Sequence, residues 1–100
     1  YPDSEREIAI VKSTLPEAES RLVEEAVAFV QRLRKEDLQK TPGIAETLDW
    51  AAALLSLGAR ELSPEIIDES LGVVLKYEED IRQVRGATAR QFLAEAGTAS

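Results

Sequence analysis

The side chains best suited to chemistry in this chain are two acidic groups, Glu24-Glu25 and Glu78-Glu79-Asp80. A metal site would need several of these carboxylates to converge on one ion. Adjacent positions on a helix point about 100° apart, so a consecutive trio does not converge, and the chain has no calcium-binding loop pattern. We therefore interpret both groups as solvated helix faces, and the sequence predicts no metal site.

Two further acids, Glu46 and Asp49, are flanked by apolar residues and share one face of a predicted helix. Acid–base catalysis would need one of them in an apolar pocket, with a partner carboxylate several ångströms away. Acids in the first turns of a helix are also favoured by the helix dipole, and we assign them that role. Because the chain has no His and no Cys, it lacks the usual general base and the usual nucleophile–base pairs. We predict no catalytic residue.

Composition narrows the class of protein. The chain has 100 residues, of which 44% are hydrophobic and 31% charged, as expected for one globular domain with one modest core. The net charge of -7 repels phosphate backbones and argues against nucleic-acid binding. No apolar run approaches the roughly 18 residues of a membrane span, and the absence of Cys fits a cytoplasmic location. The chain begins with Tyr1 and contains no Met, so we expect it to be a piece of a longer protein.

Helical periodicity runs through the whole sequence, and no stretch alternates as a strand does. The predicted fold class is all-α, a small helical bundle of four to five helices in one domain over residues 1–96, followed by a flexible tail over 97–100. Ser4 and Glu7 have the spacing of a capping box at the start of the first helix. Pro16 ends that helix, because proline has no amide hydrogen.

The second helix is predicted from about residue 17 or 20 to 38, with Arg34 among its solvated polar residues. The third, about residues 45 to 57, is apolar on two faces, as is typical of a central helix. Trp50 on this helix could stack on an adenine, but we favour a core position for it. Gly58 is the expected C-terminal cap.

Ser63 and Pro64 predict the start of the next helix, as N-cap and first helical residue. Gly72 could split this segment into a short helix and a longer one. A last helix is expected over residues 77–84, with a further turn or two over 87–94.

Three segments, in this order, resemble parts of the C-terminal helical lid of MoxR-type AAA+ ATPases. Tyr1-Pro2-Asp3 followed by Glu5-Arg6-Glu7-Ile8 resembles the entry segment that leads from the nucleotide-binding core into the lid. The stretch from Pro42 to Gly58, with its Gly-x-Ala-Glu-Thr-x-Asp-Trp run, is similar to the central lid helix. Ser63 to Val84 resembles the closing helices, so the resemblance covers the chain to about Val84.

In that family ATP and Mg²⁺ lie between a Rossmann-like core and the lid, and the subunits form rings, often hexameric. The resemblance implies that the longer protein is an ATPase with chaperone-like remodelling activity, while this chain alone is not an enzyme. The implied partners are the N-terminal AAA+ core of the same chain, the neighbouring ring subunits and a protein with a von Willebrand factor A domain. We expect no nucleic-acid partner and no membrane, because of the net charge of -7 and the lack of a long apolar run.

Many AAA+ lids carry a "sensor 2" arginine at the start of the central lid helix. Thr47 stands at the matching position here, and no Arg or Lys occurs between Thr41 and Leu57. Either the role of the sensor arginine has moved to another residue or subunit, or this lid senses nucleotide by adenine packing and rigid-body movement. A helix N-terminus still offers backbone amides and a positive dipole. The predicted nucleotide-facing edge therefore consists of Gly43, Ile44, Glu46 and Thr47.

The alternative function is a free-standing helical protein-interaction module without any link to an ATPase. Such a module binds a partner helix through an exposed apolar groove. A contiguous exposed apolar patch together with a specific partner outside the AAA+ class would favour this alternative.

Overall fold

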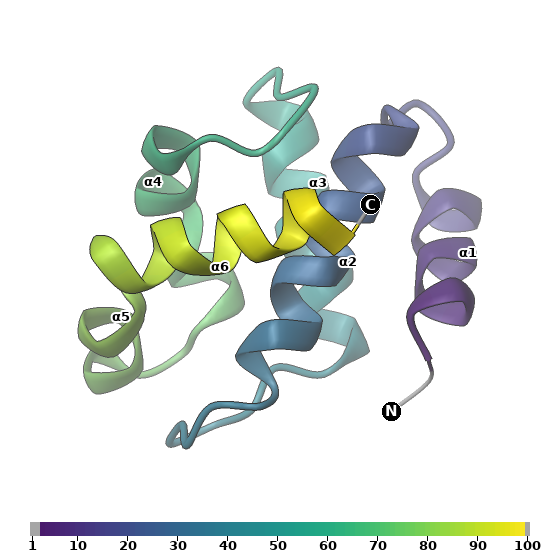
Figure 1. Ribbon diagram of the computed structural model, residues 1–100. Helices are drawn as coiled ribbons and strands as arrows, with labels where there is room; N and C mark the ends of the chain where they lie inside the picture. The colour runs from purple at the N-terminus through teal and green to yellow at the C-terminus, as the bar shows by residue number, and fades with distance from the viewer. Residues whose placement is uncertain (1–2, 100) are drawn as a thin grey trace.

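The computed structural model describes residues 3–99, with side chains described to residue 96, and folds this part of the chain into six α-helices without a strand (Figure 1). The all-α prediction is confirmed, with one helix more than the upper number expected. The helices are α1 (Ser4–Thr14), α2 (Ser20–Leu33), α3 (Ile44–Ser56), α4 (Pro64–Val74), α5 (Glu78–Val84) and α6 (Ala87–Ala99).

Helix α2 lies at the centre of the bundle, where it packs against α1, α3 and α6. Helix α1 lies along one flank of the molecule, and α4 and α5 lie on the opposite flank (Figure 1). Helix α6 crosses α2 and also contacts α4 and α5. The first turns of α1 and α3 lie at one end of the bundle, where the candidate site is found.

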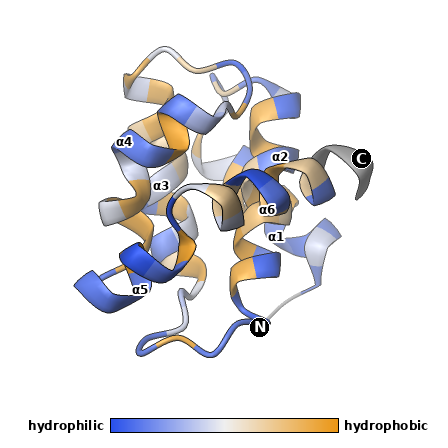
Figure 2. Cartoon of the chain, turned by 60° about the vertical axis from the view of Figure 1, so that its left-hand side comes forward, coloured by the Kyte–Doolittle hydropathy of each residue, from blue (hydrophilic) through white to orange (hydrophobic). Residues whose placement is uncertain are grey.

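The buried hydrophobic side chains of the described residues form two clusters. The main cluster joins α2, α3, α4, α5 and α6 and includes Phe29, Trp50 and Phe92. The second cluster consists of Val11, Val23, Val27 and Ala51, with partly buried side chains around it. In Figure 2 hydrophobic segments concentrate along α2, α3 and α4, whereas the outer helix α5 is mostly hydrophilic.

Trp50 is a core residue, as predicted. Its side chain is fully buried, its ring centroid lies 5.3 Å from that of Phe29, and its Nε1 donates a hydrogen bond to Ser70 Oγ at 2.8 Å. The predicted third helix reached one residue too far: α3 ends at Ser56, and Leu57, in the turn that follows, is 52% exposed.

The helix ends agree with the local signals in two places. Ser63 Oγ accepts a hydrogen bond from the Ile66 amide at 3.2 Å, with Pro64 as first residue of α4. Gly58 follows α3 with a φ of 78°, the left-handed conformation that glycine adopts without steric cost. Gly72, in contrast, does not split its segment, because α4 continues through it to Val74.

Helix α1 is capped by Asp3, whose carboxylate accepts from the Arg6 amide at 2.9 Å. The predicted capping box of Ser4 and Glu7 was therefore wrong, and Glu7 reaches across to α2 and α3 instead. Helix α2 ends at Leu33, five residues before the predicted end at Leu38. The reason is a tightened last turn, in which the amides of residues 35 and 36 bond to carbonyls three residues back.

The predicted tail over residues 97–100 is helical through residue 99, because α6 extends to Ala99. Ser100 lies outside the described residues.

Candidate functional site

The first turn of α3 holds the residues predicted to face a nucleotide. Gly43, Ile44 and Glu46 are partly exposed there. The Glu46 carboxylate accepts a hydrogen bond from the Gly43 amide at 2.7 Å. This bond lowers the pKa of Glu46 below its ordinary value, although partial burial opposes the shift. The amide just before the helix is thus already bonded to a carboxylate of the same chain.

Thr47 differs from the other three residues, because its side chain is fully buried. Its hydroxyl lies 2.8 Å from Glu7 Oε2 and 3.1 Å from the Gly43 carbonyl oxygen, and it accepts from Arg34 Nη2 at 3.3 Å. The structure therefore places Thr47 inside the bundle, one turn into α3, while Gly43, Ile44 and Glu46 remain accessible beside it.

A buried ion pair lies directly behind this turn. Arg34 Nη1 donates to Glu7 Oε1 and Arg34 Nη2 to Glu7 Oε2, both at 2.7 Å, which is the bidentate geometry of a strong charge-assisted contact. Glu7 is fully buried and the Arg34 side chain is 7% exposed. Gln31 Nε2 donates to Glu7 Oε1 at 2.8 Å. The prediction that Arg34 is a solvated residue was wrong.

The charge state of Glu7 follows from these contacts. Burial alone raises the pKa of a carboxyl group. Hydrogen bonds from Arg34, Thr47 and Gln31, together with the positive charge of Arg34, outweigh burial and lower the pKa of Glu7 below its ordinary value. Glu7 is therefore ionised at neutral pH.

Side-chain hydrogen bonds fix the connector between α2 and α3, residues 34–43. Arg34 Nε donates to the Pro42 carbonyl oxygen at 2.8 Å. The buried carboxylate of Asp80, at the start of α5, accepts from the Gln39 amide at 2.8 Å and the Lys40 amide at 3.1 Å. The entrance to α3 is thus fixed by the side chain of Arg34, the C-cap residue of α2, and by that of Asp80 in α5.

Two acids predicted to be solvated are therefore structural. Asp80 is 1% exposed and Glu25 is 6% exposed, and Glu25 accepts from the Leu62 amide at 2.9 Å. Each accepts hydrogen bonds from the backbone of a loop that lies far away in the sequence, Asp80 from two amides and Glu25 from one. Consecutive acids on a helix do diverge, as argued from the sequence, but one of each group points inward.

Sequence spacing does carry a signal for the buried polar residues that sequence reasoning missed. Glu7 lies one helical turn before Val11, and Thr47 lies one turn before Ala51. Val11 and Ala51 both belong to the second cluster. A polar residue that continues an apolar stripe at four-residue spacing points into the same interior. The polar network thus closes one end of the second cluster.

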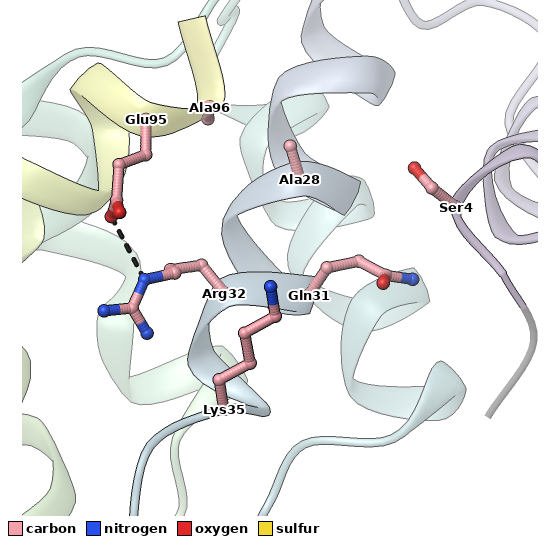
Figure 3. Close-up of a pocket in the computed structure, with 7 residues that line it drawn as sticks. All are labelled: Ser4, Ala28, Gln31, Arg32, Lys35, Glu95 and Ala96. Atoms are coloured by element: carbon pink, nitrogen blue, oxygen red, sulfur yellow. Dashed lines mark hydrogen bonds and ion pairs between the residues drawn. The ribbon is translucent and has the colours of Figure 1, made fainter. Parts of the chain in front are cut away.

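A groove of about 280 Å³ lies between α1, α2 and the end of α6 (Figure 3). Arg32 in this groove bonds to Glu95 at 3.1 Å and to Glu36 at 2.6 Å, and its guanidinium carbon lies 4.2 Å from the centroid of the Phe92 ring. The bond to Glu36 raises the pKa of Arg32. The groove is lined by Ser4, Ala28, Gln31, Arg32, Lys35, Glu95 and Ala96.

Among the described residues, no three His, Cys, Asp or Glu side chains gather as metal ligands. In the same part of the chain, no helix has both the length and the hydrophobicity of a membrane span. Comparison with known proteins gave no match to a family model, to a curated protein or to a solved structure.

Proposed function

We propose that this chain is the C-terminal helical lid of a MoxR-type AAA+ ATPase, in a longer cytoplasmic protein. The lid closes over ATP and Mg²⁺ held by an N-terminal core and couples hydrolysis to ring movement and to remodelling of partner proteins. One observation carries the proposal. The two segments with the most characteristic resemblance, the entry segment and the central helix, meet through Glu7 Oε2 and Thr47 Oγ1 at 2.8 Å.

This contact has a geometric consequence for the proposed function. Glu7 lies in the first turn of α1 and Thr47 in the first turn of α3, so both helices begin at the same end of the bundle. A core joined through the entry segment would lie next to the accessible residues Gly43, Ile44 and Glu46. This arrangement supports a lid that closes over a nucleotide.

The charges at this edge favour one of the two sensing modes left open by the sequence. Glu46 is negative and already accepts from the Gly43 amide, so it repels the phosphates of a nucleotide. Ile44, partly exposed beside it, offers an apolar contact. We therefore assign the edge to packing against the adenine or the core, not to phosphate binding.

The first test is the coding sequence that precedes Tyr1. The proposal expects a phosphate-binding loop of the GxxxxGK[ST] type within about 200 residues, a usual size for one domain. If the intact gene encodes no nucleotide-binding domain ahead of this stretch, the proposal is wrong.

The second test uses the longer protein and a matched pair of variants at the two ends of α3. Ile44→Asp should raise the KM for ATP by about tenfold, which corresponds to roughly 1.4 kcal/mol of lost contact. Leu57→Asp places the same charge at an exposed position beyond the other end of the helix and should leave the KM unchanged. Equal effects of the two variants would contradict the assignment of the edge.

The neighbouring ring subunits and a von Willebrand factor A domain protein remain proposed partners on the strength of the resemblance. The alternative of a free-standing interaction module needs a continuous apolar groove. The exposed large hydrophobic residues of the described chain are Leu57 and Tyr77, which belong to separate turns. We therefore place the alternative second.

A further inference from the structure

Helix α1 is packed separately from the rest of the bundle. Among the described side chains, the main cluster contains no residue of α1. Helix α1 contributes Val11 to the second cluster, where Ile8 and Leu15 are partly buried beside it. The main cluster is therefore formed without α1, which covers only the second cluster.

The flank of α1 that faces α6 is not packed against it. The helix packs on α2 and α3, and the groove of about 280 Å³ separates Ser4, in its first turn, from Ala96 near the end of α6 (Figure 3). Figure 1 shows α1 at the outer edge of the bundle. Helix α1 is thus attached along one face.

One polar side chain holds this helix at the end where α3 begins. Glu7 is fully buried, and its carboxylate contacts Arg34, Thr47 and Gln31. Moving α1 away withdraws the carboxylate from both Arg34 and Thr47, so the hydrogen bonds that join α1 to this end of the bundle are lost together. Arg34 also donates to the Pro42 carbonyl oxygen, so this one side chain contacts both α1 and the connector 34–43.

We propose that α1 is a releasable strap latched by Glu7, and that its release loosens the connector 34–43 and the first turn of α3 while the main cluster stays folded. Sub-global opening of this kind is expected where a segment has few apolar contacts of its own. The strap is a device of this fold. In the longer protein the strap would transmit a movement of the entry segment to the nucleotide-facing edge, and this part of the inference rests on the proposed function.

Native-state hydrogen exchange of this chain, in the absence of nucleotide and in low concentrations of urea, tests the strap without any substitution. The amide of Val11 reports on α1, that of Thr47 on the first turn of α3, and that of Leu71 on the main cluster. We expect Val11 and Thr47 to exchange through one shared opening that is at least about tenfold more frequent than the opening that exposes Leu71. A single common opening for all three amides would overturn the proposal.

Two variants then distinguish a coupled opening of α1 and the first turn of α3 from a local disturbance at the substituted residue. Glu7→Gln removes the charge of the latch, and Val11→Ala weakens the apolar docking of α1 without touching the polar network. Both should accelerate exchange at Thr47 by about tenfold or more and leave Leu71 unchanged. Glu5→Gln, at an exposed position of the same helix, is the matched control and should change neither amide.

The result of Val11→Ala is decisive. If it accelerates exchange in α1 but not at Thr47, α1 and the first turn of α3 are not coupled and the proposal is wrong. If either variant accelerates Leu71 as much as Thr47, the chain opens as one unit and the proposal is also wrong. Because the assay contains no nucleotide, these outcomes are independent of whether the longer protein is an ATPase.

Discussion

The variant Glu7→Leu removes the carboxylate buried between α1, α2 and α3 while keeping a side chain of similar length. In the structure this carboxylate accepts hydrogen bonds of 2.7–2.8 Å from Arg34, Thr47 and Gln31. The variant leaves the guanidinium of Arg34, 7% exposed, as a buried charge. Removing one partner of a buried ion pair costs about 3–5 kcal/mol in the free energy of unfolding.

Because the new leucine buries apolar surface of its own, we expect a loss near the lower end of that range, about 3 kcal/mol. A domain of this size is stable by about 5–15 kcal/mol, so the variant loses a large part of its stability. Each kcal/mol lowers the Tm by roughly 4–8 °C in a chain of 60–100 residues. The change is therefore large enough to measure by urea unfolding followed by circular dichroism at pH 7.

The double variant Glu7→Leu/Arg34→Met tests the cause of the loss. Replacing both members of a buried ion pair by apolar residues is often neutral. We expect the double variant to lose at least about 2 kcal/mol less than the sum of the two single losses. Glu5→Leu, at an exposed position of α1, is the control and should stay within about 0.5 kcal/mol of the original chain. A loss below about 1 kcal/mol for Glu7→Leu, or strict additivity of the two single losses, would refute the reasoning.

Three further predictions concern stability. The folded-state pKa of Glu7 lies below its ordinary value of 4.5. The stability that its ionised form contributes is therefore present above pH 4.5 and lost as the pH falls through the folded-state pKa. Acid titration followed by circular dichroism should show this loss of stability, and the loss should be smaller in Glu7→Gln. Trp50→Phe should cost about 1 kcal/mol in urea unfolding, because it removes the hydrogen bond to Ser70. Gly72→Ala, in a helix with open space around it, should stabilise by about 0.5–1 kcal/mol, whereas Gly58→Ala should destabilise by about 1–2 kcal/mol because φ is 78° there. Thermal unfolding of the two glycine variants checks that Gly72→Ala raises the Tm and that Gly58→Ala lowers it.

The fold class and the start of α4 were predictable because their signals are local. Ser63 and Pro64 act on amides of their own first turn, and helical periodicity depends on neighbouring positions alone. The core position of Trp50 followed in the same way from the apolar residues around it on α3. None of these inferences required information about which helix packs against which.

The partners of the buried polar residues could not be predicted by the same reasoning. Glu7 and Arg34 are 27 residues apart in the sequence, and each by itself has the composition of a solvated helix face. Only the packing of α1 against α2 brings Glu7 and Arg34 together, so that each buried charge is stabilised by the other. The same holds for Asp80, whose partners Gln39 and Lys40 belong to a loop some forty residues earlier. For the candidate edge, the spacing of Thr47 and Ala51 signals that Thr47 points inward, but its partner Glu7 lies 40 residues away and could not be named from the sequence.

The uneven distribution of aromatic rings between the two clusters makes the strap visible to simple spectroscopy. The single tryptophan of the chain belongs to the main cluster, beside Phe29, whereas the second cluster has no aromatic side chain. Indole emission therefore reports on one cluster, while the helical ellipticity at 222 nm reports on both. On heating, the ellipticity should begin to fall before the emission shifts to the red, so the two melting curves separate. Coincident curves are the mark of an all-or-none transition and would show that α1 leaves the bundle only when everything else does.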